Sequence, residues 1–169
     1  PRHGVRRQRQ MCIRDRLGVD LPPVAVPLAA YVPAVTSGSY VYTAGQLPLR
    51  DGSLLATGRV GLEVDVPTAA GCARQCAINA LAAIRAEIGD LDRVRRVVKV
   101  VGYVASSPDL TAHPAVVNGA SELLAEVLAE AGVHARSAVG VASLPLGAPV
   151  EVELVVEVGP RDEDSAAAG

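Results

Sequence analysis

The sequence predicts an α+β fold in which two helices pack on one face of a mixed β-sheet. Two segments carry apolar residues spaced by three and four, as amphipathic helices do, and β-branched segments precede, separate and follow them. Paired strands are expected at both ends of this series, joined by turn-rich connections. With 169 residues, the chain has the size of one ordinary domain with one core.

The first predicted element is a β-hairpin over residues 34–43, with its turn at Ser37-Gly38-Ser39. The second strand continues into Ala44-Gly45-Gln46-Leu47-Pro48, where Pro48 ends regular pairing. The turn-rich segment over residues 50–60 then predicts a loop with one small strand.

The first helix is predicted over residues 67–88, where apolar side chains recur at three and four. Pro67 suits the first turn of a helix, and Gly89 supplies its end. The next segment, residues 94–105, is too rich in β-branched side chains for a helix and predicts one long strand.

A second amphipathic helix is predicted from Val116 to Ala131, with Pro114 near its start and Gly132 at its end. Two strands follow, over residues 135–142 and 150–158. Helices on one face leave the other face of the sheet uncovered. Because half of the residues are apolar, we expect another subunit to cover that face.

Charge is distributed unevenly along the chain. Residues 1–16 hold six arginines against one acid, whereas the rest holds 10 basic and 17 acidic residues, a net charge of −7. Such a body repels phosphate backbones, so nucleic acid is not expected as the main partner. Residues 1–16 end in MCIRDR, which resembles a translated sequencing adapter, and we interpret them as an artefactual or disordered leader, with a basic arm as the alternative. Residues 17–158 form the predicted single domain, and residues 159–169 a disordered acidic tail.

No apolar run reaches the length of a membrane-spanning helix, so we expect a soluble protein that does not bind membranes. Outside the leader the cysteines are Cys72 and Cys76, four apart on one face of the first predicted helix. Their spacing matches neither zinc nor redox motifs, which predicts buried thiols in a reducing, cytoplasmic location.

The usual catalytic motifs are absent: the sequence has no phosphate-binding loop, no metalloprotease motif and no serine-hydrolase elbow. The sequence also has no cluster of metal-ligating residues. His113 precedes Pro114 and is expected to cap a helix or lie on the surface. His134 is expected to have a structural or surface role, and the alternative is that it lines a site, because it is close in sequence to Arg136.

Arg136 is the basic residue that stands out, because no other lies between Lys99 and Arg161. Its planar guanidinium suits a carboxylate, although a simple surface charge explains it as well. Glu151 and Glu153 alternate with apolar residues on the last strand and so share one face. One of them could pair with Arg136 or polarise a water molecule, and a solvated strand face is the alternative.

Three separated segments carry a resemblance. They are Ala30-Tyr31 followed by Thr43–Pro48, Val117-Asn118 at the second helix, and residues 135–153 with their arginine, Leu-Pro and glutamate pattern. Together they resemble the RidA/YjgF family, also called endoribonuclease L-PSP or chorismate mutase-like, over about residues 21–158. The resemblance implies the chorismate mutase-like fold and a homotrimer with a site in each cleft between subunits.

The resemblance also implies an activity, the hydrolysis of enamines and 2-iminoacids to a 2-oxoacid and ammonia. Its partner would be a small carboxylate, and no cofactor is required. Arg136 would hold the substrate carboxylate and Glu151 would activate water. Tyr31 would line the cleft from the neighbouring subunit, and the Gly45 and Ala138 amides would contact the bound acid.

Asn118 would complete this set, either at the substrate or by bonding a loop backbone. The chain departs from the family pattern at Ala44, where many relatives have serine, at Ala138, where some have cysteine, and at Ser121, where an aromatic residue is common. These departures predict a divergent branch. The alternatives are a non-catalytic trimer that binds 2-oxoacids, and the RNA cleavage that an older family name suggests, which the net charge of −7 disfavours. A chorismate mutase reaction rests on the fold alone.

Overall fold

The computed structural model describes residues 18, 21–24 and 30–160, so the predicted leader and the tail from residue 161 onwards lie outside the described residues. The strands are β1 (Ala34–Ser37), β2 (Tyr40–Thr43), β3 (Leu49–Arg50), β4 (Ser53–Leu54), β5 (Val94–Ala105), β6 (Ala135–Val141) and β7 (Val150–Val158). The helices are α2 (Val66–Ile88) and α3 (His113–Leu128), with short 3-10 helices η1 (Leu91–Arg93), η2 (Ala129–Gly132) and η3 (Pro145–Gly147).

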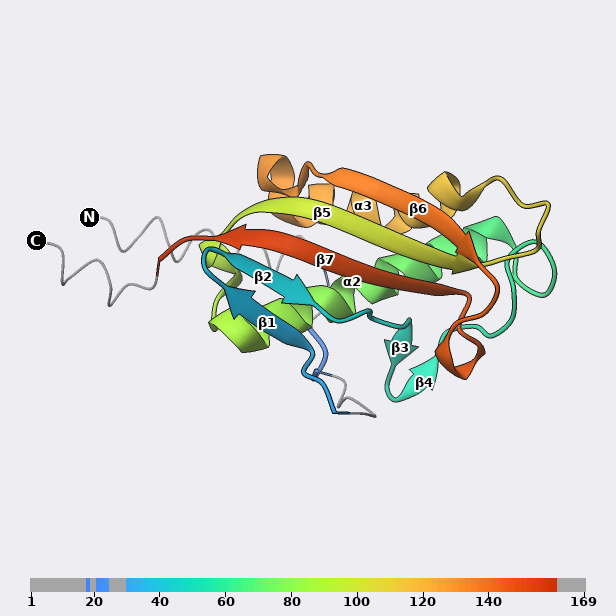
Figure 1. Ribbon diagram of the computed structural model, residues 1–169, viewed down its shortest axis with the longest axis horizontal. Coiled ribbons are helices and arrows are strands. Elements are labelled where there is room, and N and C mark those ends of the chain that lie inside the picture. Colours follow the sequence, from blue (N-terminus) through green and yellow to red (C-terminus); the bar gives the residue numbers. More distant parts are fainter. Residues whose placement is uncertain (1–17, 19–20, 25–29, 161–169) are drawn as a thin grey trace, which may run out of the picture.

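Five strands form one mixed sheet in the order β1-β2-β7-β5-β6, with both long helices on the same side of it (Figure 1). In this sheet β6 runs parallel to β5, and the other neighbours are antiparallel. The predicted α+β fold is confirmed. Because β5 lies between β6 and β7, the two last strands of the chain are not neighbours, and the pairing predicted for them is wrong.

Most predicted elements are confirmed, and two differ in detail. The segment expected to hold one small strand forms the β3–β4 hairpin instead, with its turn at Asp51-Gly52, where both residues have a positive φ. The second helix was predicted to reach Ala131, but it ends at Leu128 because Ala129 adopts a φ of 53°. The chain then continues as η2 to Gly132.

The sequence also explains how each helix begins. The Asp65 side chain accepts a hydrogen bond from the Thr68 amide at 2.8 Å and so caps α2, with Pro67 in the first turn as predicted. In α3, Pro114 lies in the first turn, and no side chain caps the helix. The two helices approach closely where Gly119 meets the Ala70 carbonyl, because a Cβ at residue 119 would collide with it.

The core lies between the sheet and the helices. The side chains of β5 and β7 that point to the helices are fully buried there; they are Val97, Val100, Val104, Val150, Val152, Leu154 and Val156. Cys72 and Cys76 of α2 are buried free thiols, as predicted. No helix in the described residues is long and apolar enough to cross a membrane.

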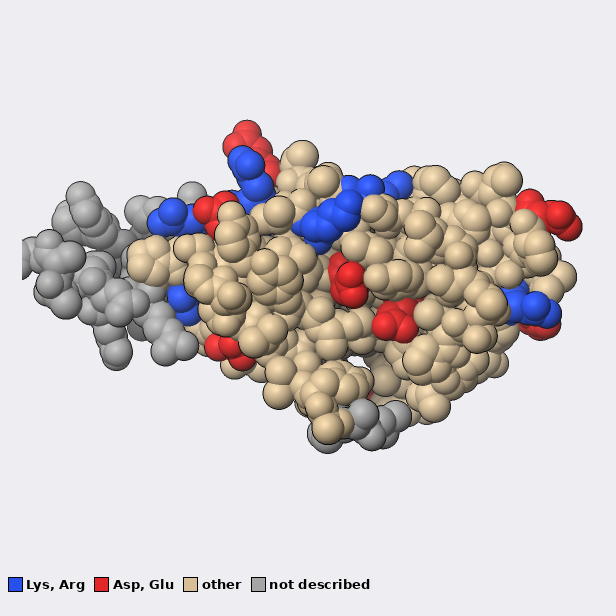
Figure 2. All heavy atoms as spheres, in the orientation of Figure 1, with Lys and Arg blue, Asp and Glu red and all other residues tan. Residues whose placement is uncertain are grey.

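Neither α2 nor α3 covers the opposite face of the sheet (Figure 1). It exposes large apolar and aromatic side chains from three strands, which are Val35, Tyr40, Tyr42 and Val139. Figure 2 shows this face as mainly uncharged, with acidic and basic side chains near its middle. We refer to it below as the open face.

Candidate functional site

Arg136 lies near the start of the edge strand β6, directly opposite Val100 of β5. Since paired residues share a face, its side chain projects towards α3 rather than the open face. The guanidinium Nη1 donates to Asn118 Oδ1 at 2.8 Å and to Ser121 Oγ at 3.1 Å. Nη2 donates to the Pro114 carbonyl at 3.3 Å. Helix α3 therefore holds this arginine through three separate contacts.

All three acceptors of the Arg136 guanidinium are neutral. Within the described part of the chain no carboxylate forms an ion pair with it, so its positive charge is not compensated by a partner. A guanidinium has five N–H groups, and the three bonds leave Nε–H and one Nη2–H available. Two free N–H groups are what a carboxylate accepts in a bidentate pair.

Glu151 projects to the open face from the start of β7, opposite Tyr103 of β5. Its carboxylate lies against Gly45, where a Cβ would force the Glu151 side chain to move. The neighbouring amides of Ala44 and Gln46 donate to the Pro33 and Val152 carbonyls. No such bond is found for the Gly45 amide among the described residues, which leaves one donor beside one carboxylate.

The surroundings of Glu151 favour its protonated form. Burial raises the pKa of its carboxyl above the usual value, and the nearby Glu153 charge raises it further. Glu153 itself accepts a hydrogen bond from the Tyr103 hydroxyl at 3.2 Å. Glu151 is therefore a carboxylate prepared to take up a proton, a property of general bases.

Within one chain, Arg136 and Glu151 do not meet. They project from opposite faces of the sheet, with β5 between their strands. The alternative in which Arg136 pairs with Glu151 or Glu153 is therefore not found in the described residues of the single chain, because the antiparallel pairing of β7 with β5 displaces β6 to the edge.

The other predicted site residues fall into the same two groups. Asn118 contacts Arg136, and Ala138 lies two residues further along β6 on the same face, partly buried against the core. Gly45 belongs with Glu151. Tyr31 stands before β1 with 54% of its surface exposed, so it is free to reach a neighbouring molecule.

Comparison with known proteins gives the family. A family model described as "YjgF/chorismate mutase-like, putative endoribonuclease" matches residues 14–158. The chain belongs to the YjgF/RidA family. Among its relatives, Protein TCP17 of Trypanosoma cruzi is 46% identical over 145 residues, which cover 85% of this chain and 91% of that protein.

Two solved structures are similar to this chain. Atu1372 of Agrobacterium tumefaciens, a protein of unknown function, is 45% identical with a TM-score of 0.85, over 91% of this chain and 98% of that one. YjgF of E. coli is 30% identical with a TM-score of 0.56, over 81% and 93% of the two chains. The chain is thus more similar to Atu1372 than to YjgF of E. coli, in sequence and in structure.

Sequence reasoning missed a buried polar cluster between α2 and the segment that follows Gly45. The Asn79 side-chain amide of α2 donates to the Leu47 and Leu49 carbonyls at 2.9 and 3.0 Å. Gln75 donates to Asn79 at 3.0 Å and accepts two bonds from Arg50. The cluster fixes the chain between Gly45 and β3. Its signal was two amides four residues apart within an otherwise apolar helix face.

The two histidines each bond a serine. His113, at the first position of α3, lies 3.1 Å from Ser106 Oγ and thereby ties the start of the helix to the end of β5. His134 lies 2.9 Å from Ser121 Oγ, the same oxygen that Arg136 contacts. The pairing of His134 with Ser121 could not be read from their separation of 13 residues.

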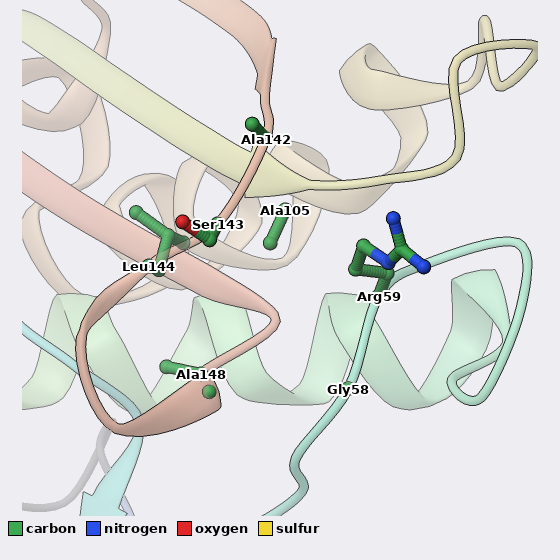
Figure 3. Close-up of a pocket in the computed structure, with 8 residues that line it drawn as sticks. Gly58, Arg59, Ala105, Ala142, Ser143, Leu144 and Ala148 are labelled. Atoms are coloured by element: carbon green, nitrogen blue, oxygen red, sulfur yellow. The ribbon is translucent and has the colours of Figure 1, made fainter.

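A pocket of about 330 Å³ lies where β6 ends, between the connection to β7 and the loop at Gly58-Arg59 (Figure 3). Small side chains line most of it, and Arg59 stands apart from Leu144 and Ala148 (Figure 3). None of the predicted site residues lines this pocket. The described residues include no group of three or more histidine, cysteine, aspartate or glutamate side chains able to hold a metal.

Proposed function

We propose that this protein hydrolyses 2-iminoacids and the related enamines. Water adds to the C=N carbon, the nitrogen takes up a proton, and ammonia leaves as the C=O bond of the 2-oxoacid forms. The observation that carries the proposal is the Arg136 guanidinium, which neutral acceptors hold in place while two of its N–H groups remain free for a carboxylate.

The site we propose is shared between subunits of a homotrimer. Arg136 and Glu151 project from opposite faces of one sheet, so a single chain does not bring them to one substrate. A cleft between neighbouring subunits brings the edge strand β6 of one chain against Glu151, Gly45 and Tyr31 of the next. The exposed aromatic and apolar side chains of the open face supply a surface for this association.

The proposed reaction requires little of the protein, because a protonated imine is already an electrophile. Arg136 fixes the substrate carboxylate, which orients C2. Glu151 takes a proton from the attacking water, and its raised pKa suits that task. The Gly45 amide donates to the bound acid, and Ala138 is proposed to do so through its own backbone amide. Asn118 acts on Arg136.

A second candidate function is the binding of 2-oxoacids without catalysis. It is favoured by Ala44 and Ala138, which offer no hydroxyl or thiol to the substrate. RNA cleavage, which the family description names, is opposed by the net charge of −7 outside residues 1–16. The buried free thiols of Cys72 and Cys76 support a reducing compartment, and we propose the cytoplasm.

The test is an imine-trapping assay. An amino-acid oxidase releases a 2-iminoacid in the presence of semicarbazide, and the full chain is scored by the fraction diverted to free 2-oxoacid. Arg136→Ala should lower kcat/KM roughly 100-fold, as expected for the loss of a bidentate charge-assisted pair worth about 3 kcal/mol. Arg74→Ala removes an exposed arginine of α2 that pairs with Glu126, and is the matched control.

Turnover that is lost in Arg136→Ala and retained in Arg74→Ala supports the proposal. Equal turnover by wild type and Arg136→Ala contradicts it. A folded wild type that binds 2-oxobutanoate in calorimetry without accelerating imine decay establishes the binding function instead.

A further inference from the structure

The contacts of His134 select one tautomer of its neutral ring. Its Nδ1 lies 2.6 Å from the Gly132 carbonyl oxygen, which can only accept a hydrogen bond, so Nδ1 carries the proton. The Nε2 of the neutral ring is then an acceptor. Since Ser121 Oγ lies 2.9 Å from Nε2, the serine hydroxyl donates to the histidine.

This pattern determines what Ser121 offers to Arg136. A serine hydroxyl has one proton and two lone pairs, and the proton is used on His134. Only lone pairs remain for Arg136 Nη1, which donates to Oγ at 3.1 Å. If His134 did not accept this proton, the Ser121 hydroxyl would rotate freely. Its proton could then point towards the guanidinium and disrupt the hydrogen bond from Arg136 to Oγ.

We propose that His134 and Ser121 are positioning residues for the Arg136 guanidinium, which they hold so that its free N–H groups receive the carboxylate of the substrate. This inference rests on the proposed function. The path runs from the Gly132 carbonyl through His134 and Ser121 to Arg136, and every member is within hydrogen-bond distance of the next.

The choice of neutral groups is what makes this arrangement suited to a ligand. A carboxylate in place of Ser121 or Asn118 would hold the arginine more strongly, but it would also compensate the charge that binds the substrate. Ser121, Asn118 and the Pro114 carbonyl fix the side chain and leave its charge for an anion. The ligand class that fits is a small carboxylate.

A purely structural role is the competing explanation, since the His134–Ser121 bond also ties α3 to the segment before β6. The chain provides a matched control. The Ser106–His113 bond, 3.1 Å long, ties the other end of the same helix to β5 and has no contact with Arg136. Ser106→Ala therefore removes a bond of the same kind whose two side chains make no contact with the guanidinium.

The experiment compares Ser121→Ala, His134→Leu, His134→Gln and Ser106→Ala in the full chain. We expect Ser121→Ala and His134→Leu to raise both the KM for the iminoacid and the Kd for 2-oxobutanoate about tenfold, with kcat changed less than about threefold. His134→Gln presents an amide oxygen to the Ser121 hydroxyl and should restore most of the lost affinity. Ser106→Ala should lower the melting temperature without changing KM.

A second readout needs no substrate. Long-range proton–nitrogen NMR should show His134 protonated at Nδ1 and unprotonated at Nε2. The opposite tautomer overturns the inference. The inference is also overturned if KM and Kd are unchanged in both Ser121→Ala and His134→Leu while Arg136→Ala is inactive. That last pattern leaves the proposed function standing. A wild type that neither turns over the iminoacid nor binds 2-oxobutanoate overturns both inferences. Loss of affinity in these variants without any wild-type turnover supports the positioning role and contradicts hydrolysis.

Discussion

At the scale of single residues, the pH dependence of activity tests the assignment of Glu151. The proposed base acts in its ionised form, and burial together with Glu153 raises its pKa. Replacing Glu153 by glutamine removes the second of these causes, so the acid limb of the kcat/KM profile should move to lower pH. Glu157→Gln, on the same strand but opposite Tyr40, should leave the limb in place.

The raised pKa of Glu151 also makes the free energy of unfolding depend on pH in a defined direction. Because the folded state holds the Glu151 proton more tightly than the unfolded chain, this carboxyl favours folding at low pH. That contribution is lost as the pH rises from the unfolded pKa through the raised folded pKa.

An acid limb of the kcat/KM profile that is identical in wild type and Glu153→Gln would contradict the role of Glu151 as the titrating base.

Individual residues differ in how far the sequence reveals them. Arg136 and Glu151 could be singled out, because each is a charged group within an otherwise apolar strand. The residues that contact them could not be singled out from the sequence. Asn118 and Ser121 reach Arg136 only because α3 packs against β6, and a separation of 18 or 15 residues carries no signal of that contact. The roles of the site residues remain predictions.

At the scale of elements, the Asn79 side chain should be a major determinant of stability. Asn79→Ala removes the bonds to the Leu47 and Leu49 carbonyls and leaves the buried Gln75 side-chain amide without its acceptor. We expect a loss of about 2 kcal/mol or more in the free energy of unfolding. The comparison is Glu126→Ala, which removes the exposed Arg74 ion pair and should cost less than about 1 kcal/mol.

Urea denaturation of the two variants decides this point. The Asn79 variant should also show weaker iminoacid binding, because the chain that carries Gly45 is no longer held to α2. Equal stability losses in the two variants would show that the buried cluster is not the element that fixes this loop.

Helices and strands that carry a long pattern of apolar residues were predicted accurately, whereas short elements and helix ends were predicted less accurately. The strands over residues 94–105 and 150–158 were predicted to the residue, since both are runs of β-branched side chains. The β3–β4 hairpin has strands of two residues each, too short to leave a pattern. The end of α3 depends on the positive φ of Ala129, which alanine rarely adopts and the sequence does not announce.

At the scale of the whole molecule, the open face should carry the association of subunits. Tyr42 is 44% exposed in the single chain and pairs across β1 and β7 with Val35 and Val155. A charge at this position is costly to bury, so Tyr42→Glu should dissociate the proposed trimer. Light scattering should give about three times the 17.3 kDa chain mass for wild type and a lower mass for the variant.

Leu62→Glu is the control for this prediction, because Leu62 is also exposed but lies in the loop before α2. It should retain the wild-type mass. A monomeric wild type would contradict the proposed shared site, and so would a Tyr42→Glu variant that keeps the trimer mass with an unchanged circular dichroism spectrum.

The sequence revealed the uncovered face, but not how the strands are ordered across it. A chain order of β5, β6, β7 gave no reason to expect β5 between the other two, and hence no reason to separate Arg136 from Glu151. This strand order is what makes a shared site the central claim of our account.

The most direct test of that claim is complementation between inactive variants. Arg136→Ala and Glu151→Gln are each unfolded, then refolded together in equal amounts, and imine turnover is measured. If each site takes its arginine from one chain and its glutamate from another, about a quarter of the sites in random trimers hold both native residues, and activity returns to about that level. If the mixture stays as inactive as either variant alone while it assembles normally, the two residues do not act together across a subunit boundary.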